Sequence, residues 1–194
     1  MNKFITIGLI AVVAIILLSG FGTYNSLVAL DQNAQAKWAQ DEGQYQRRMD
    51  LIPNLVATVK GAANFEQTTL DQVVEARAKA TQVVVDPTKL DTASIAKYQS
   101  AQGELGSALG RLLAVSENYP KLTATENFKD LQSQIEGTEN RIAVARKDFS
   151  DAVQTYNTSV KRFPGNLFAR MFGFTEKAYF TADVGAAKAP PVAF

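Results

Sequence analysis

The sequence predicts an all-α protein in which an N-terminal transmembrane helix is followed by an antiparallel bundle of three to four long helices. Two observations lead to this prediction. No charged residue occurs between Phe4 and Leu30, and the segment FITIGLIAVVAIILLSGF in that interval is almost entirely apolar. Beyond it, apolar residues recur every three to four positions over long stretches joined by short connections, which is typical of helices that pack together in a bundle.

The apolar segment is just long enough to cross a bilayer, since a transmembrane helix needs about 20 predominantly apolar residues. We therefore expect residues 1–23 to form an uncleaved, single-pass anchor in the membrane lipid. The alternative is a cleaved signal peptide, because Lys3 supplies a short basic region and Gly20 to Gly22 form a small-x-small pattern. A lipid-modified anchor would need a cysteine where this chain has Phe21, and the chain contains no cysteine.

The charges on either side of the apolar segment indicate an orientation. Lys3 precedes the segment, and the first charges after it are Asp31 and then Lys37. Because basic residues are enriched on the cytoplasmic side of membrane spans, this distribution favours a cytoplasmic N-terminus with the body of the protein outside the cytoplasm.

Residues 24–63 are expected to form one long helix, or a helix that continues the membrane span. Pro53 lies inside this helix, where a proline costs about 3 kcal/mol. One solution is that Asp50 caps a new helix with Pro53 in its first turn, and the other is a kink in a continuous helix. We favour the kink because the apolar spacing crosses the proline without a gap. The apolar face comprises Leu27, Leu30, Ala34, Trp38, Tyr45, Met49, Ile52, Val56 and Val59.

Three further helices are expected after the first. Apolar periodicity predicts helices over residues 66–82 and 92–118, joined by a connection that contains an Asp-Pro step. The strongest pattern follows the sequence TATE, which begins at Thr123 and fits a capping box, and it continues as far as the turn RFPGN. The segment NLFARMF predicts a short amphipathic helix. The bundle domain thus covers residues 24–175, and the tail, residues 176–194, lacks helical period.

The residue types present exclude most catalytic and metal chemistry. Without histidine or cysteine, the chain has no Ser-His or Cys-His arrangement and no histidine or cysteine ligands for zinc. The adjacent carboxylates Asp41 and Glu42 point about 100° apart on a helix and are expected on a solvated face. Apart from Lys3, basic and acidic residues are equal in number, which argues against nucleic-acid binding. We expect no catalytic, cofactor-binding or metal-binding residues.

The segment RRMDLIPNLV around the proline is a candidate interaction or kink-supporting site. Acidic residues occur in the next predicted helix, so one of the two arginines can pair across the helical hairpin while its stem covers apolar surface. A structural arginine pair is the simpler interpretation, and a contact surface for a partner is the alternative. The residues concerned are Arg47, Arg48, Asp50, Pro53 and Asn54.

The segment NLFARMFGF is a candidate surface contact. Aromatic rings beside an arginine are typical of a small interfacial membrane anchor, although the segment is short and weakly basic. Covering the protein's own bundle is the simpler interpretation of these rings. The residues concerned are Phe168, Arg170, Phe172 and Phe174.

Three parts of the chain closely resemble the LemA family of membrane-anchored bacterial proteins. They are YNSLVALDQNAQAKWAQDEGQYQRRMDLIPNLVATVKGAANFEQTTLDQVVEAR from Tyr24 to Arg77, RFPGNLFARMFGFTEKAYF, and the closing APPVAF. The resemblance implies a bundle of long α-helices after a transmembrane segment, in a family that is not known for an active site. Some relatives look like lipoproteins, from which this chain departs at Phe21. Descriptions of other relatives place the body in the cytoplasm, against the charge distribution, so the orientation stays open.

These observations predict a non-catalytic, membrane-anchored protein that acts as a scaffold or adaptor for other membrane or envelope proteins of a bacterium. Its partners would be the membrane lipid, through the anchor, and one or more proteins. Homo-oligomers are a further expectation, because confinement to a membrane raises the effective concentration of weak contacts. A lipid-binding or membrane-remodelling assembly protein is the alternative.

Overall fold

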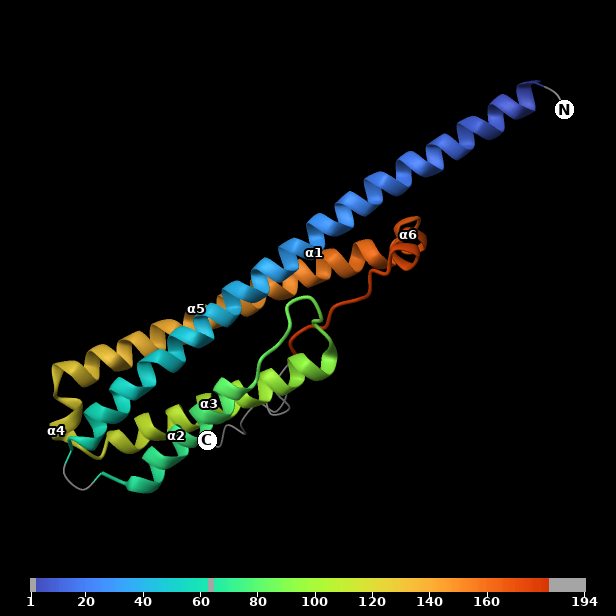
Figure 1. Ribbon diagram of the computed structural model, residues 1–194. Helices are drawn as coiled ribbons and strands as arrows, with labels where there is room; N and C mark the ends of the chain where they lie inside the picture. Colours follow the sequence, from blue (N-terminus) through green and yellow to red (C-terminus); the bar gives the residue numbers. More distant parts are fainter. Residues whose placement is uncertain (1–2, 63–64, 182–194) are drawn as a thin grey trace, which may run out of the picture.

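The computed structural model describes residues 3–62 and 65–181, and within them every regular element is a helix (Figure 1). This confirms the predicted all-α class. The helices are α1 (Lys3–Lys60), α2 (Gln67–Gln82), α3 (Thr92–Ser116), α4 (Pro120–Thr123), α5 (Glu126–Lys161) and α6 (Gly165–Phe172).

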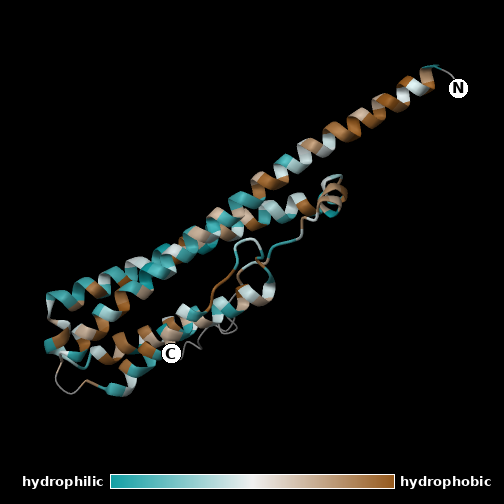
Figure 2. Ribbon diagram, in the orientation of Figure 1, coloured by the Kyte–Doolittle hydropathy of each residue, from teal (hydrophilic) through white to brown (hydrophobic). Residues whose placement is uncertain are grey.

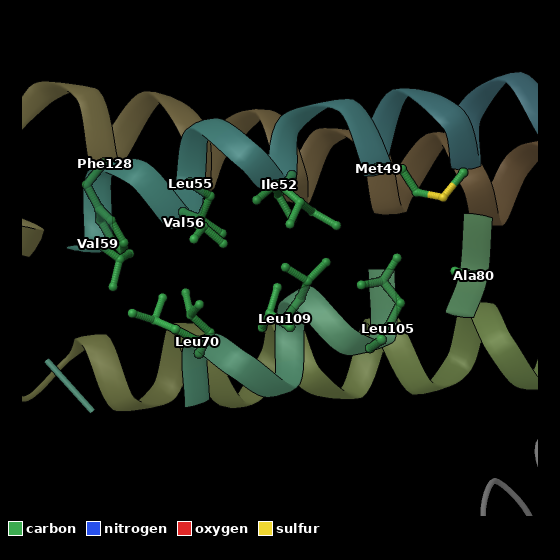
Figure 3. Close-up of a cluster of buried hydrophobic side chains, with 14 of the residues drawn as sticks. Met49, Ile52, Leu55, Val56, Val59, Leu70, Ala80, Leu105, Leu109 and Phe128 are labelled. Carbon is green, nitrogen blue, oxygen red and sulfur yellow. The ribbon is translucent and has the colours of Figure 1, made fainter. Parts of the chain in front are cut away.

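The four long helices form two packed pairs. α1 packs along α5 and α2 packs along α3, and the direction of the chain reverses from each long helix to the next (Figure 1). The pair of α1 and α5 lies over the pair of α2 and α3, with apolar side chains from both layers meeting between them (Figure 3). The predicted antiparallel bundle after an apolar N-terminal helix is therefore confirmed.

α1 is one continuous helix of 58 residues that belongs to two environments. The large apolar side chains between Phe4 and Phe21 are exposed, and this segment has the length and composition needed to cross a membrane (Figure 2). From Leu27 to Val59, one face of the same helix is buried in the bundle. The helix continues across residue 23, where the sequence suggested a boundary between the anchor and the bundle.

Two apolar clusters make up the core. The first contains Ala34, Trp38, Tyr45, Val85, Leu90, Ile95, Tyr98, Ile142, Phe149, Ala152 and Val153. The second lies further along α1, includes Ile52, Leu55, Leu70, Leu105, Leu109 and Phe128, and is drawn in Figure 3. The indole of Trp38 is fully buried and contacts the rings of Tyr98 and Phe149, with centroid distances of 5.1 and 5.4 Å.

The start of α5 differs from the sequence prediction. The predicted capping box at Thr123 is wrong, because Thr123 ends the short helix α4 and the residue that precedes α5 is Thr125. Pro120 occupies the first turn of α4, where its missing N–H had no partner to lose. The hydroxyl of Thr125 donates to the carbonyl of Leu122 at 2.7 Å, so it is engaged with α4 and does not cap α5.

The segment after α6 runs back along the bundle in an extended conformation. Gly173 ends α6 with φ of 79°, a left-handed conformation that favours glycine. The side-chain amide of Asn157 donates to the carbonyl of Lys177 at 2.8 Å and accepts from its N–H at 2.9 Å. Phe180 then stacks on Trp38 at 5.8 Å. The closing APPVAF motif and Phe194 lie outside the described residues.

Candidate functional site

A layer of polar side chains crosses the bundle between the two apolar clusters. Arg48 lies at its centre, only 3% exposed, on the face of α1 that carries Tyr45 and Ile52 toward the core. A buried charge requires hydrogen bonds to compensate its lost hydration. The sequence placed Arg48 beside Arg47 as one candidate pair, but the structure separates them: Arg48 is buried and Arg47 is exposed.

The guanidinium of Arg48 joins three helices. Its Nη1 donates to Glu139 Oε1 on α5 at 2.7 Å, and its Nη2 donates to the carbonyl oxygen and to Oε1 of Gln102 on α3 at 3.0 and 2.8 Å. The same group lies over the ring of Tyr45, 5.1 Å from its centroid, a geometry that favours a cation–π interaction. Because these bonds are directional, they fix the register of α1 against α3 and α5.

Asp41, two turns before Arg48, is a second charged residue in the interior. It is 0% exposed, and neither of its carboxylate oxygens accepts a hydrogen bond from the part of the chain that the structure describes. Burial raises the pKa of Asp41 to about 7, and Glu42 adds to this rise, while the charges of Arg146 and Arg48 oppose it. The carboxyl group therefore titrates near neutral pH.

The surroundings of Asp41 are aromatic. Tyr45 and Tyr98 lie edge to face, with their ring centroids 5.3 Å apart. Burial raises the pKa of Tyr45 to about 12, and it also raises the pKa of Tyr98. In the described part of the chain, the hydroxyl of Tyr98 and the Nε1 of Trp38 are buried and make no hydrogen bond. Buried polar groups without hydrogen bonds are rare in folded proteins. Their grouping around an acid that titrates near neutrality makes this the chemically unusual region of the bundle.

The sequence prediction for this region was wrong. Asp41 was expected with Glu42 on a solvated face, but Asp41 is fully buried and Glu42 is half-buried. Asp41 follows Trp38 by three residues and precedes Tyr45 by four, so it shares their helical face. This spacing indicated a buried position for Asp41, but the charge of its side chain suggested an exposed one.

Pro53 lies in the interior of α1, so the alternative of a new helix starting at Asp50 is excluded. In a regular helix the N–H of residue 53 would donate to the carbonyl of residue 49. Proline has no N–H, and the Nε of Arg77 on α2 donates to the carbonyl of Met49 instead, at 2.9 Å. This contact explains how the helix tolerates the proline, and it ties the second layer of the bundle to α1. The sequence suggested Arg47 and Arg48 for such support; Arg77 provides it.

The Arg77 contact predicts a coupling with Pro53. Arg77→Ala should lower the free energy of unfolding by about 1.5 kcal/mol, because it leaves the Met49 carbonyl without its charged donor. In a Pro53→Ala background residue 53 regains its N–H, so the cost of Arg77→Ala should fall by about 1 kcal/mol. Chemical denaturation of the four proteins in detergent measures this cycle.

Arg111→Ala is the matched control for this cycle, because Arg111 is an exposed arginine of α3 that hydrogen-bonds Gln72. Its effect should be the same with proline or alanine at position 53. An equal cost of Arg77→Ala in both backgrounds would show that the Arg77 donor does not replace the missing N–H.

The outer face of α1 carries the other residues of the RRMDLIPNLV segment. Arg47, Asp50, Pro53 and Asn54 are all exposed, and the Nε2 of Gln46 donates to Asp50 at 2.7 Å. Arg47 and Asp50 line a shallow groove of about 660 Å³. The other residues of this groove are Ala39, Gln40, Gly43, Gln44, Gln46 and Arg141. The exposed residues form a surface on the bundle that is separate from the buried Arg48 layer.

The second sequence-predicted group lies at the opposite end of the bundle, around α6. Phe168 packs over Gly20 of α1, where an added Cβ would lie 3.0 Å from the ring. Phe172 and Phe174 flank Tyr24 at centroid distances of 5.0 and 5.8 Å. Arg170 is exposed. Most of the aromatic surface predicted as an external contact therefore packs on α1.

A bundle built directly on the continuation of an apolar, membrane-length helix defines a membrane-attached helical protein. Among residues 3–62 and 65–181, no three acidic side chains come together as metal ligands. The chain belongs to the LemA family, whose sequence profile matches residues 37–194.

Individual proteins with similar sequences agree with this family assignment. The magnetosome protein MamQ 1 of Paramagnetospirillum magneticum is 28% identical, over 81% of this chain and 64% of that protein. MamQ of Magnetospirillum gryphiswaldense is 27% identical with the same coverage. Protein LemA of Metamycoplasma hominis is 22% identical, over 84% of this chain and 70% of its own length. The chain thus spans less than two thirds of the MamQ proteins. With the apolar segment of α1, these relatives identify a membrane-associated protein.

Proposed function

We propose that the protein is a non-catalytic scaffold or adaptor that holds a protein partner at a fixed position above a bacterial membrane. The observation that carries the proposal is the continuity of α1, a single helix that contains the apolar segment and then runs through the bundle beside α5 (Figure 1). With a rise of about 1.5 Å per residue, Lys60 lies about 58 Å beyond Phe21 along the helix. A partner bound to the bundle would keep its distance from the bilayer.

The outer face of α1 is the proposed contact surface. Arg47, Asp50 and Asn54 are spaced by three and four residues, so they form one exposed stripe beside the groove that Gln40 and Arg141 also line. Both signs of charge occur there, which suits recognition of a polar protein surface with complementary charges. The composition of the chain, which contains neither histidine nor cysteine, supports a role without catalysis.

Site-specific photocrosslinking in native membranes tests the contact surface. Gly43 is exposed in the groove, and a Cβ added there has no atom within 4 Å, so p-benzoylphenylalanine is introduced at this position. Gly103 on α3 is equally open and serves as the control position. We expect a reproducible heterologous adduct from position 43 and none from position 103.

Charge reversal on the same surface tests specificity. Arg47→Glu should reduce the amount of adduct formed from position 43. Arg111 is an exposed arginine on α3, and Arg111→Glu should leave that amount unchanged. Arg48 is left intact because replacing a buried arginine would change stability as well as contacts. Equal adducts at both positions, or adducts of the chain only with itself, would contradict the adaptor proposal.

A further inference from the structure

We infer that α6 and the turn before it form an interfacial element that lies in the headgroup layer of the bilayer and fixes the tilt of the bundle on the membrane. This inference concerns lipid and does not depend on a protein partner. It rests on where α6 lies, on which of its side chains are exposed, and on the charges around them.

The position of α6 places it at one boundary of the apolar segment. The stretch from Phe4 to Phe21 is about 27 Å long, close to the thickness of a hydrocarbon core of about 30 Å. α6 meets α1 at the end of this stretch, with Phe168 against Gly20 and Phe172 against Tyr24. Figure 1 shows α6 beside α1 where α1 leaves the bundle. Because α1 is continuous there, inserting the apolar segment brings α6 to the bilayer surface.

Part of α6 remains uncovered by the protein. Ala169 is fully buried on the inner side, whereas Phe163, Leu167 and Met171 are 75%, 58% and 66% exposed. Leu167 and Met171 are one helical turn apart on α6, Phe163 lies in the turn that precedes α6, and Phe172, 42% exposed, adds to the apolar surface. Elsewhere in the described bundle, the exposed large apolar side chains lie in different segments: Val74 on α2, Val84 between α2 and α3, Val144 on α5 and Tyr179 after α6. A grouped apolar surface of this kind marks an interaction site.

The charges around the patch fit a bilayer surface. Arg162 and Arg170 are exposed beside the apolar side chains. Lys161 is paired with Glu176 at 2.7 Å. Apolar side chains that enter the acyl boundary, flanked by arginines that reach headgroup phosphates, are the composition of an interfacial helix. Tyr24, an aromatic residue at the end of the apolar segment, lies where aromatic residues are enriched in membrane proteins.

The fixed contact with α1 would give this element its structural effect. A single membrane-spanning helix is free to tilt, within limits set by its flanking residues. An apolar patch on one side of that helix, held at the boundary by the packing of Phe168 on Gly20, would favour the tilt that immerses the patch. The bundle would then lean toward the side of α6.

The absence of cysteine from the chain allows a direct test. Single cysteines replace Leu167 or Met171, and each carries a nitroxide label on the full chain in nanodiscs of phosphatidylcholine and phosphatidylglycerol. Electron paramagnetic resonance then compares relaxation by oxygen, which partitions into the bilayer, with relaxation by a water-soluble nickel complex. Val144→Cys on α5 is the matched control, because Val144 is 61% exposed and lies on the bundle.

We expect the ratio of oxygen to nickel accessibility at positions 167 and 171 to exceed the ratio at position 144 several-fold. Ratios equal to that of the control would overturn the inference. A second outcome would also overturn the inference: the labels are protected from both reagents, and spin–spin broadening disappears on dilution with unlabelled protein. A second copy of the chain would then cover α6. Circular dichroism confirms that each labelled protein is folded.

Discussion

Replacing Asp41 with asparagine should stabilise the protein at pH 8 and remove most of its pH dependence between about pH 4 and pH 7. Burial raises the pKa of Asp41 from 3.8 to about 7 in the folded protein. Between these two values the folded state binds more protons than the unfolded state, so stability falls as pH rises through this window. Since one pKa unit corresponds to about 1.4 kcal/mol, the whole change is roughly 4 kcal/mol.

Thermal unfolding of the full chain in detergent, followed by circular dichroism at pH 4.5 and pH 8, measures this effect. For a protein of this size, the predicted stabilisation at pH 8 corresponds to a rise in Tm of roughly 10 °C. Asp50→Asn is the matched control, because Asp50 is exposed on the same helix, and its effect should be small at both pH values. An Asp41→Asn protein that is less stable than wild type at pH 8 would show that Arg146 and Arg48 stabilise the ionised carboxylate more than burial destabilises it.

Arg48→Ala should lower the free energy of unfolding by about 3 to 5 kcal/mol, the range for strongly destabilising core substitutions. The change removes a fully buried side chain and its contact with Tyr45, and it leaves the side-chain oxygen of Gln102 without its donor. Glu139 loses its partner as well, but its side chain is 44% exposed and can be hydrated. Denaturant titration of the full chain gives the difference.

Two further substitutions separate the contributions of packing and charge at position 48. Arg48→Met keeps most of the buried volume but also leaves the side-chain oxygen of Gln102 without its donor, so its cost should be smaller than that of Arg48→Ala, at about 1 to 3 kcal/mol. Arg47→Ala, at the exposed neighbour, should change stability by less than about 0.5 kcal/mol. Equal effects of Arg48→Ala and Arg47→Ala would contradict the buried position of Arg48.

The long helices could be predicted because their apolar residues recur with helical period. The predicted range of residues 66–82 agrees with α2 to within one residue. Of the predicted turn RFPGN, Arg162, Phe163 and Pro164 lie between α5 and α6, whereas Gly165 and Asn166 already belong to α6. The capping box failed because Pro120 starts a short helix that shifts the true boundary to Thr125. Apolar periodicity therefore predicts the course of a helix well. Where two possible capping sequences compete at a helix end, packing decides at which residue the helix begins.

The interior site was harder to predict because charge and burial conflict there. Asp41 and Arg48 occupy core positions by spacing, yet Asp41 was expected on a solvated face, and Arg48 was expected in a pair across the helical hairpin or at a partner contact. The role of Arg77 could not be inferred from sequence, because it depends on α2 lying beside the proline of α1. The same limit applies to the tail, where Asn157 binds the backbone of Lys177 across 20 positions of sequence.

A scaffold that holds its partner at a fixed position requires α1 to act as one rigid element from the membrane to the end of the bundle. The described interactions support that rigidity at three positions along α1. Phe168 packs on the helix where it leaves the apolar segment, Arg48 joins it to α3 and α5, and Arg77 supplies the donor lost at Pro53. A hinge at any of these positions would let a bound partner move freely above the bilayer.

A distance measurement between the apolar segment and the bundle tests this claim most directly. Nitroxide labels at Phe21→Cys and Asn54→Cys, both exposed positions of α1, can be placed on the cysteine-free chain in nanodiscs. Double electron–electron resonance should give one narrow distribution centred near about 50 Å, the length of a continuous helix between these residues. A broad distribution, or one centred at a much shorter distance, would show a hinge between anchor and bundle and would contradict the scaffold account.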